Sequence, residues 1–262
     1  MGTKNYRIRV SEFVELIIDH DAEAFGFFKK DATPNVNLFL NKLIPNLLQL
    51  RKKRRKTIHE TIDETLTFYK EKIDAEHIRS AIDTVIDKVY FSTSKFQRLD
   101  GSICIRPNDN CQTTFDEIIE SETEITGLDM SGCVRSLLNE YCKLPLYTRE
   151  SIAFQKELEC INKSYYNGHI LHLTYQEQKY RVVVLQLIYG FYSDQHNYII
   201  CYDTNNHSFN SFYLSEIRHP YTIKAKFDPS EELLEILQGY LDDFTFAKTT
   251  IYKLEEKEDV TL

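Results

Sequence analysis

The chain has 262 residues, of which 42% are hydrophobic and 27% are charged, and its formal net charge is −8. This length allows one large domain or two to three small ones, and the mixture is that of an ordinary globular protein. No apolar stretch approaches the roughly eighteen residues that a membrane helix needs, and the first residues lack the apolar core of a signal peptide, so we expect a cytoplasmic protein without a membrane partner.

Residues 5–10 alternate between apolar and polar side chains, which is the period of a short strand. The polar face of this strand would hold Asn5, Arg7 and Arg9. Ser11 can cap the helix that follows, and Asn35 can cap a second helix, in which Pro45 predicts a kink or a new start. A third, long helix is expected over 58–90, where apolar residues recur at helical spacing.

Six consecutive cations end the second helix, and these are Arg51, Lys52, Lys53, Arg54, Arg55 and Lys56. A helix spreads them round its whole surface, and contact with phosphates would neutralise them and release counterions. The alternative is a solvated helix end whose charge suits the helix dipole. We favour phosphate contact, because six cations exceed what a helix dipole needs. The distribution of charge also suits a localised phosphate-binding face, since residues 1–60 hold twelve Lys and Arg against seven Asp and Glu, whereas residues 227–262 hold three against ten.

A second alternating segment at 102–107 is again followed by helical patterns. We therefore interpret 5–50 and 102–145 as an internal repeat of one strand and two helices. Both copies resemble the ribbon–helix–helix fold, in which two such strands form an antiparallel ribbon that lies in the DNA major groove. The resemblance implies that base edges are read by Asn5, Arg7, Arg9, Ser102, Cys104 and Arg106. The bland alternative is two amphipathic edge strands with solvated arginines.

The third region begins with a helix over 149–166 and, after Asn167 and Gly168, continues with short segments rich in β-branched and aromatic residues, separated by polar breaks. This pattern predicts a small meander or barrel of four or five strands. A helix from Pro229, a last strand over 244–254 and a solvated acidic tail would follow.

The segment 196–203, HNYIICYD, and the segment 211–217, SFYLSEI, resemble the signature of the WYL domain. That family has an SH3-like or Sm-like β-barrel and occurs in bacterial transcription regulators and CRISPR-linked accessory proteins. The resemblance covers 152–226, and its signature positions are Tyr175, Arg181, Asn197, Tyr198, Ile199 and Phe212. Asn210 and Glu216 stand where the family has arginines for an anionic ligand, so such a ligand is not implied here. The ring of Tyr198 either stacks on a base or packs in the core, and we favour packing.

These features predict an α+β fold in three parts. Residues 1–150 would form a helical region whose two ribbon–helix–helix-like elements, 5–50 and 102–145, are linked by a long helix. Residues 151–226 would form the WYL-like barrel, and residues 227–262 a short α/β extension with an acidic tail.

The predicted function is that of a nucleic-acid-binding regulator. It would act as a WYL-type DNA-binding transcription regulator or as a CRISPR accessory; alternatively, it would bind single-stranded RNA and modulate an RNA-guided type VI effector. Both families suggest a homodimer, and the sequence leaves open whether the two repeats pair within one chain. None of the six cysteines forms a C-x-x-C pair, and nucleophile-elbow, P-loop, dinucleotide-binding and H-E-x-x-H motifs are missing. We expect no catalytic residue, metal or cofactor.

Overall fold

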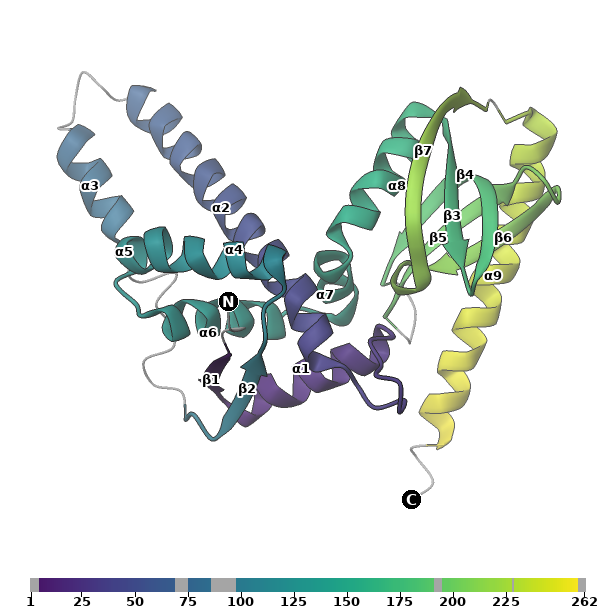
Figure 1. The fold of residues 1–262 in the computed structure, drawn as a ribbon. Helices are drawn as coiled ribbons and strands as arrows, with labels where there is room; N and C mark the ends of the chain where they lie inside the picture. The colour runs from purple at the N-terminus through teal and green to yellow at the C-terminus, as the bar shows by residue number, and fades with distance from the viewer. Residues whose placement is uncertain (1–4, 69–74, 86–97, 191–194, 228, 259–262) are drawn as a thin grey trace. The chain divides into compact units, whose positions relative to one another are not determined.

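The computed structural model describes residues 5–68, 75–85, 98–190, 195–227 and 229–258. The chain forms two compact units, Met1–Leu144 and Pro145–Leu262 (Figure 1). The division lies at Pro145, which is the N-cap of the first helix of the second unit, whereas the predicted boundary was at 150. Within the described residues, no helix combines the length and apolar character required to cross a membrane.

In unit 1, β1 (Tyr6–Val10) and β2 (Gly101–Ile105) pair antiparallel into a two-stranded ribbon. The register sets Tyr6 opposite Ile105 and Val10 opposite Gly101. The side chains of one ribbon face are at most 4% exposed, and they are Ile8, Val10, Ile103 and Ile105. The predicted alternation is therefore confirmed, and the two strands pair within a single chain.

Each strand of the ribbon is followed by helices. β1 leads into α1 (Glu12–Ala24) and α2 (Val36–Phe68), and β2 leads into α4 (Asp109–Glu117), the π-helical turn η2 (Ile118–Glu122), α5 (Thr123–Thr126) and α6 (Met130–Cys142). Ser11, Asn108 and Asp129 cap α1, α4 and α6, each with a side-chain oxygen that accepts a main-chain N–H. The core between the copies is built by buried aliphatic residues of α2 and α6, among them Leu40, Leu43, Val134 and Leu138.

α2 does not begin anew at Pro45, which was one of the two predicted outcomes. It is a single helix that includes the proline, and Ile44 and Leu47 on either side of it are buried. The predicted third helix over 58–90 is wrong as a separate element, since residues up to 68 belong to α2 and a distinct helix, α3 (Ala75–Val85), follows. Residues 69–74 and 86–90 of that prediction lie outside the described residues.

Unit 2 begins with α7 (Leu146–Ala153) and α8 (Gln155–Asn167), where a single helix was predicted. An antiparallel sheet follows in the order β6-β5-β4-β3-β7. Its strands are β3 (His169–Tyr175), β4 (Gln178–Tyr189), β5 (Asn197–Asp203), β6 (Ser208–Tyr213) and β7 (Ile217–Lys226), with a 3₁₀ turn, η3 (Leu214–Glu216), before the last. Closure would require pairing between β6 and β7. Because β7 pairs with β3 alone among the described strands, the predicted closed barrel is wrong.

The C-terminal extension is helical. α9 (Glu231–Glu258) spans the segment 244–254 for which a strand was predicted. Half-buried apolar residues recur along its first half at helical spacing, and they are Leu233, Leu237, Tyr240, Leu241 and Phe244. Two of these rings reach the sheet: Tyr240 lies 5.4 Å from Phe209 and Phe244 lies 5.1 Å from Tyr198, between ring centroids. The expected α/β extension is therefore corrected to a single helix.

Candidate nucleic-acid interface

The outward face of the ribbon carries the residues that the sequence predicts to read bases. The register sets Arg7 opposite Cys104 and Arg9 opposite Ser102. Arg7, Arg9, Cys104 and Arg106 are exposed, as is Asn5 at the start of the ribbon, and Ser102 is half-buried. Arg7 donates from Nη2 to Oγ of Ser102 over 3.4 Å, across the two strands. The structure thus brings the predicted residues together on one surface.

Two asparagines on α2 fix the end of β2. The main-chain N–H of Arg106 donates to Oδ1 of Asn37 over 2.7 Å, and its carbonyl accepts from Nδ2 of Asn41 over 3.0 Å. Oδ1 of Asn41 also accepts the N–H of Asn108 over 2.6 Å. The backbone of Arg106 is therefore held on both sides while its side chain stays exposed. Sequence reasoning missed this pair, although two asparagines four residues apart on one helix face are a visible signal.

A further guanidinium lies at the ribbon. Arg135 on α6 donates from Nε to the carbonyl of Arg9 over 2.7 Å. Two carboxylates lie at the end of the ribbon that begins with Gly101, and both accept main-chain N–H groups. Glu15 accepts from Ser102 over 3.2 Å, and Asp100 accepts from Glu12 over 2.8 Å, a hydrogen bond that lowers the pKa of Asp100. These contacts add the guanidinium of Arg135 to those of Arg7, Arg9 and Arg106 at the ribbon.

The run of six cations divides into paired and exposed members. Arg51 is only 2% exposed, and its Nη2 lies 2.5 Å from Oε1 of Glu140 and 2.9 Å from Oγ of Ser136. Burial lowers the pKa of the Arg51 guanidinium, and the nearby Glu140 acts against this. Arg55 forms a bidentate pair with Glu122, at 2.8 and 3.1 Å. For these two arginines the predicted phosphate contact is wrong, because they hold the two repeats together.

The remaining cations are more accessible. Lys52 pairs with Glu117, and Lys56 pairs with Glu60 at 3.7 Å along the same helix. Lys53 and Arg54 are exposed and form no ion pair with any residue that the structure describes. The surface available to a phosphate therefore centres on Lys53 and Arg54 rather than on the whole run.

The WYL-signature positions lie inside unit 2. Asn197, Tyr198, Ile199 and Phe212 are each at most 2% exposed. The ring of Tyr198 packs 4.8 Å from that of Tyr213, and its hydroxyl donates to the Tyr213 hydroxyl over 3.2 Å. Packing of Tyr198 in the core is therefore confirmed, and its use as a stacking surface for a base is not compatible with this burial. Tyr175 lies 4.7 Å from Phe212, between ring centroids, while Arg181 is half-buried.

Asn197 has a role that sequence reasoning missed. Its Nδ2 donates to the carbonyl of Tyr147 over 2.7 Å, and its main-chain N–H donates to Oε2 of Glu150 over the same distance. Glu150 is fully buried and also accepts the N–H of Ser215 over 3.1 Å. The first signature position therefore anchors α7 to the sheet.

The titratable groups of the described residues do not gather into a metal site. No group of three His, Cys, Asp or Glu side chains there could hold a metal ion. The six cysteines carry free thiols, and burial raises the pKa of Cys111 to about 12 and also raises the pKa of Cys133. Cys104 is the cysteine that lies exposed, at the centre of the ribbon's outward face.

Comparison with known proteins supports the fold. No protein-family model matches the chain, and no curated protein matches it. Among solved structures, one described as the crystal structure of a CRISPR Cas-related protein matches 88% of this chain with a TM-score of 0.61 and 14% identity. This chain covers 65% of that structure, less than two thirds of its length. Proteasome accessory factor B/C (PafBC) of Arthrobacter aurescens matches 51% of this chain and 24% of its own, with 15% identity and a TM-score of 0.27, which is too low to carry an argument. The chain therefore shares the fold of a CRISPR Cas-related protein.

Proposed function

We propose that this chain is a non-enzymatic, nucleic-acid-binding regulatory protein that uses the β1–β2 ribbon as its reading surface. The observation that carries the proposal is the antiparallel pairing of the two strands within one chain, with Arg7, Arg9 and Arg106 exposed on the same face. A two-stranded ribbon fits the major groove of B-form DNA, and a guanidinium can grip a guanine through two hydrogen bonds.

The support beneath the ribbon suits this role. Ile8 and Ile103 are buried under the strands, and the ring of Tyr6 stacks on that of Phe115 with a centroid distance of 4.4 Å. Asn37 holds the backbone of Arg106 in place. A reading surface loses less conformational entropy on binding when its scaffold is already fixed. The ribbon is therefore a well-supported platform for the exposed arginine side chains.

Replacing Arg7 and Arg9 by Ala tests this function. If they read bases, each change should weaken binding to the preferred duplex by roughly 1–3 kcal/mol and leave other sequences nearly unaffected. Fluorescence anisotropy with duplexes selected from a random pool would measure this. Lys143→Ala, which removes an exposed cation of the same unit away from the ribbon, is the control. An equal loss on all sequences would mean that the two arginines supply charge only.

A second surface, Lys53 and Arg54, would contact phosphates. Changing both to Gln should weaken binding to all sequences alike and flatten the dependence of log affinity on log salt by roughly 0.7–0.9 per lost contact. Gln keeps much of the helix propensity of Lys and Arg, so α2 should stay intact. The exposed pair Lys29 and Lys30, changed to Gln in the same way, provides the matched control. An unchanged salt slope in the α2 variant would remove this helix from the binding surface.

The alternative function is an RNA-binding accessory that modulates an RNA-guided type VI CRISPR effector. The shared fold with a CRISPR Cas-related protein favours it. Competition between duplex DNA and single-stranded RNA for the same protein separates the two functions, since only the alternative expects the RNA to displace the duplex. A homodimer also belongs to the proposal. Because one chain already completes the ribbon, such a dimer would associate through another surface.

A further inference from the structure

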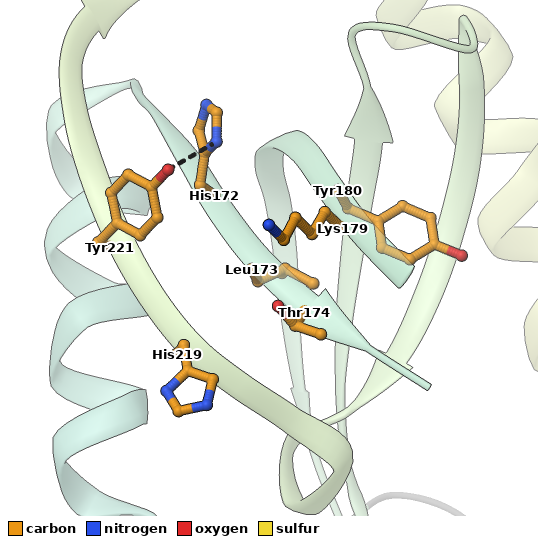
Figure 2. Close-up of a pocket in the computed structure, with 7 residues that line it drawn as sticks. All are labelled: His172, Leu173, Thr174, Lys179, Tyr180, His219 and Tyr221. Carbon is orange, nitrogen blue, oxygen red and sulfur yellow. Dashed lines mark hydrogen bonds between the residues drawn. The ribbon is translucent and has the colours of Figure 1, made fainter. Parts of the chain in front are cut away.

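A pocket of about 250 Å³ opens in unit 2 between β7 and the β3–β4 hairpin (Figure 2). Its seven lining residues are His172, Leu173, Thr174, Lys179, Tyr180, His219 and Tyr221. One lysine and two histidines are among them, and none is acidic. The Tyr180 ring points away from the others and packs 5.0 Å from Phe212. The other polar side chains of the lining come from the three strands β3, β4 and β7.

The register places four of these side chains on the same face of the sheet. His172 is opposite Tyr221, and Thr174 is opposite Lys179. Directly opposed residues of an antiparallel pair project to the same side. Nδ1 of His172 lies 3.1 Å from the hydroxyl of Tyr221, and the two rings are 5.0 Å apart. In Figure 2 the ammonium end of Lys179 points toward β3.

β7 carries a bulge at the pocket. Between the pairs His172–Tyr221 and Thr174–Arg218, it has one residue more than β3, so His219 and Pro220 together face Leu173. His219 has a φ of 50°, in the left-handed region that side chains other than glycine rarely adopt. Strained backbone of this kind persists where the surroundings fix it, and it gathers at binding sites. The bulge places the exposed imidazole of His219 in the lining of the pocket.

We propose that this pocket binds a phosphate group. The Lys179 ammonium, the imidazoles of His172 and His219 and the hydroxyls of Thr174 and Tyr221 supply its hydrogen bonds, and the lining carries no carboxylate that would repel it. The pocket lies below the range of about 300–1,000 Å³ that holds drug-sized ligands, which suits a phosphate with part of the molecule attached to it. The site shares no residue with the ribbon, so it stands independently of the proposed function.

Isothermal titration calorimetry on the full chain tests the site, with inorganic phosphate, a nucleoside monophosphate and the corresponding nucleoside as probes. We expect heat of binding with the two phosphates and none with the nucleoside. Lys179→Gln should weaken binding roughly ten- to a hundredfold, the effect of one hydrogen bond to a charged group. Lys224→Gln, at an exposed lysine of β7 outside the pocket, should leave it unchanged. No binding of either phosphate at millimolar concentration, or an equal loss in both variants, overturns the proposal.

The phosphate could belong to the end of a nucleic acid or to a small phosphoester. Two single-stranded RNAs of the same sequence, one with and one without a 5′-phosphate, distinguish these two sources. A preference for the phosphorylated strand that Lys179→Gln abolishes identifies the end of a nucleic acid as the ligand. Displacement of the monophosphate by neither strand identifies a small phosphoester. Both outcomes support the phosphate site, and they identify which kind of molecule carries the phosphate.

His219→Gly separates binding from structure. Glycine adopts the left-handed conformation freely, so the melting temperature should stay the same or rise. The affinity for phosphate should nevertheless fall severalfold, because one donor is lost. An unchanged affinity would overturn the assignment of His219 as a ligand-binding residue.

Discussion

Replacing Arg51 by Met is expected to lower the free energy of unfolding of unit 1 by about 3 kcal/mol, near the lower end of the range for breaking a buried ion pair. Methionine keeps the apolar length of the side chain but removes the partner of Glu140 and the donor to Ser136. The loss stays at the lower end because the Glu140 side chain is 29% exposed and can be partly hydrated. Chemical denaturation followed by circular dichroism measures the loss.

Lys53→Met is the matched control, because it removes a neighbouring cation that is exposed. We expect it to change stability by less than about 0.5 kcal/mol. Glu140→Gln, alone and combined with Arg51→Met, completes a double-mutant cycle that isolates the pair from the effect of burial. Equal effects of Arg51→Met and Lys53→Met would contradict the division of the run into structural and exposed cations.

The basic run shows where prediction from sequence ends. Six adjacent cations identify a charged helix segment, but the carboxylates that pair with Arg51, Lys52 and Arg55 lie in the second repeat, far along the chain. Whether a cation is free or paired depends on those long-range contacts. The ribbon could be predicted better, because strand alternation and side-chain capping at Ser11 are local properties.

The features that sequence reasoning missed in unit 2 depend on tertiary structure. A sheet closes into a barrel only where its two edge strands pair. An open sheet and a closed barrel have the same meander pattern in the sequence, so the sequence does not distinguish them. The segment 244–254 has the composition of a strand, yet it belongs to helix α9. The half-buried apolar residues of α9, the last of which is Phe244, pack on the sheet. The bulge at His219 follows from a register shift between β3 and β7, and no local sequence motif predicts that shift.

The pairing of both strands within one chain also affects specificity. A ribbon made from two identical chains presents the same residues twice, and its target is correspondingly palindromic. Here β1 contributes Arg7 and Arg9, whereas the second strand segment contributes Ser102, Cys104 and Arg106. The two halves of the reading surface therefore differ. Under the proposed function, a single chain would select an asymmetric site, with most of its guanidinium contacts on one half.

Replacing Glu150 by Ala should destabilise unit 2 by roughly 2–5 kcal/mol, because it leaves two buried main-chain amides without their acceptor. These are the N–H groups of Asn197 and Ser215, at 2.7 and 3.1 Å from the fully buried carboxylate. His196, whose Nδ1 lies 3.2 Å from the same carboxylate, would lose its contact as well. Hydrogen exchange should show faster exchange at the Asn197 and Ser215 amides, with unit 1 unaffected.

Glu150→Gln and Glu159→Ala serve as comparisons for the Glu150→Ala variant. Gln keeps one acceptor oxygen, so we expect a loss between that of the Ala variant and zero. Glu159 is exposed on α8, and its replacement should change stability by less than about 0.5 kcal/mol. Glu150→Gln and Glu150→Ala could instead destabilise unit 2 equally. The sheet would then require the negative charge of Glu150, and its oxygens as acceptors for the two main-chain amides would matter less. If Glu150→Ala were as mild as Glu159→Ala, the anchoring of α7 to the sheet would rest on the side-chain amide of Asn197, which donates to Tyr147 over 2.7 Å.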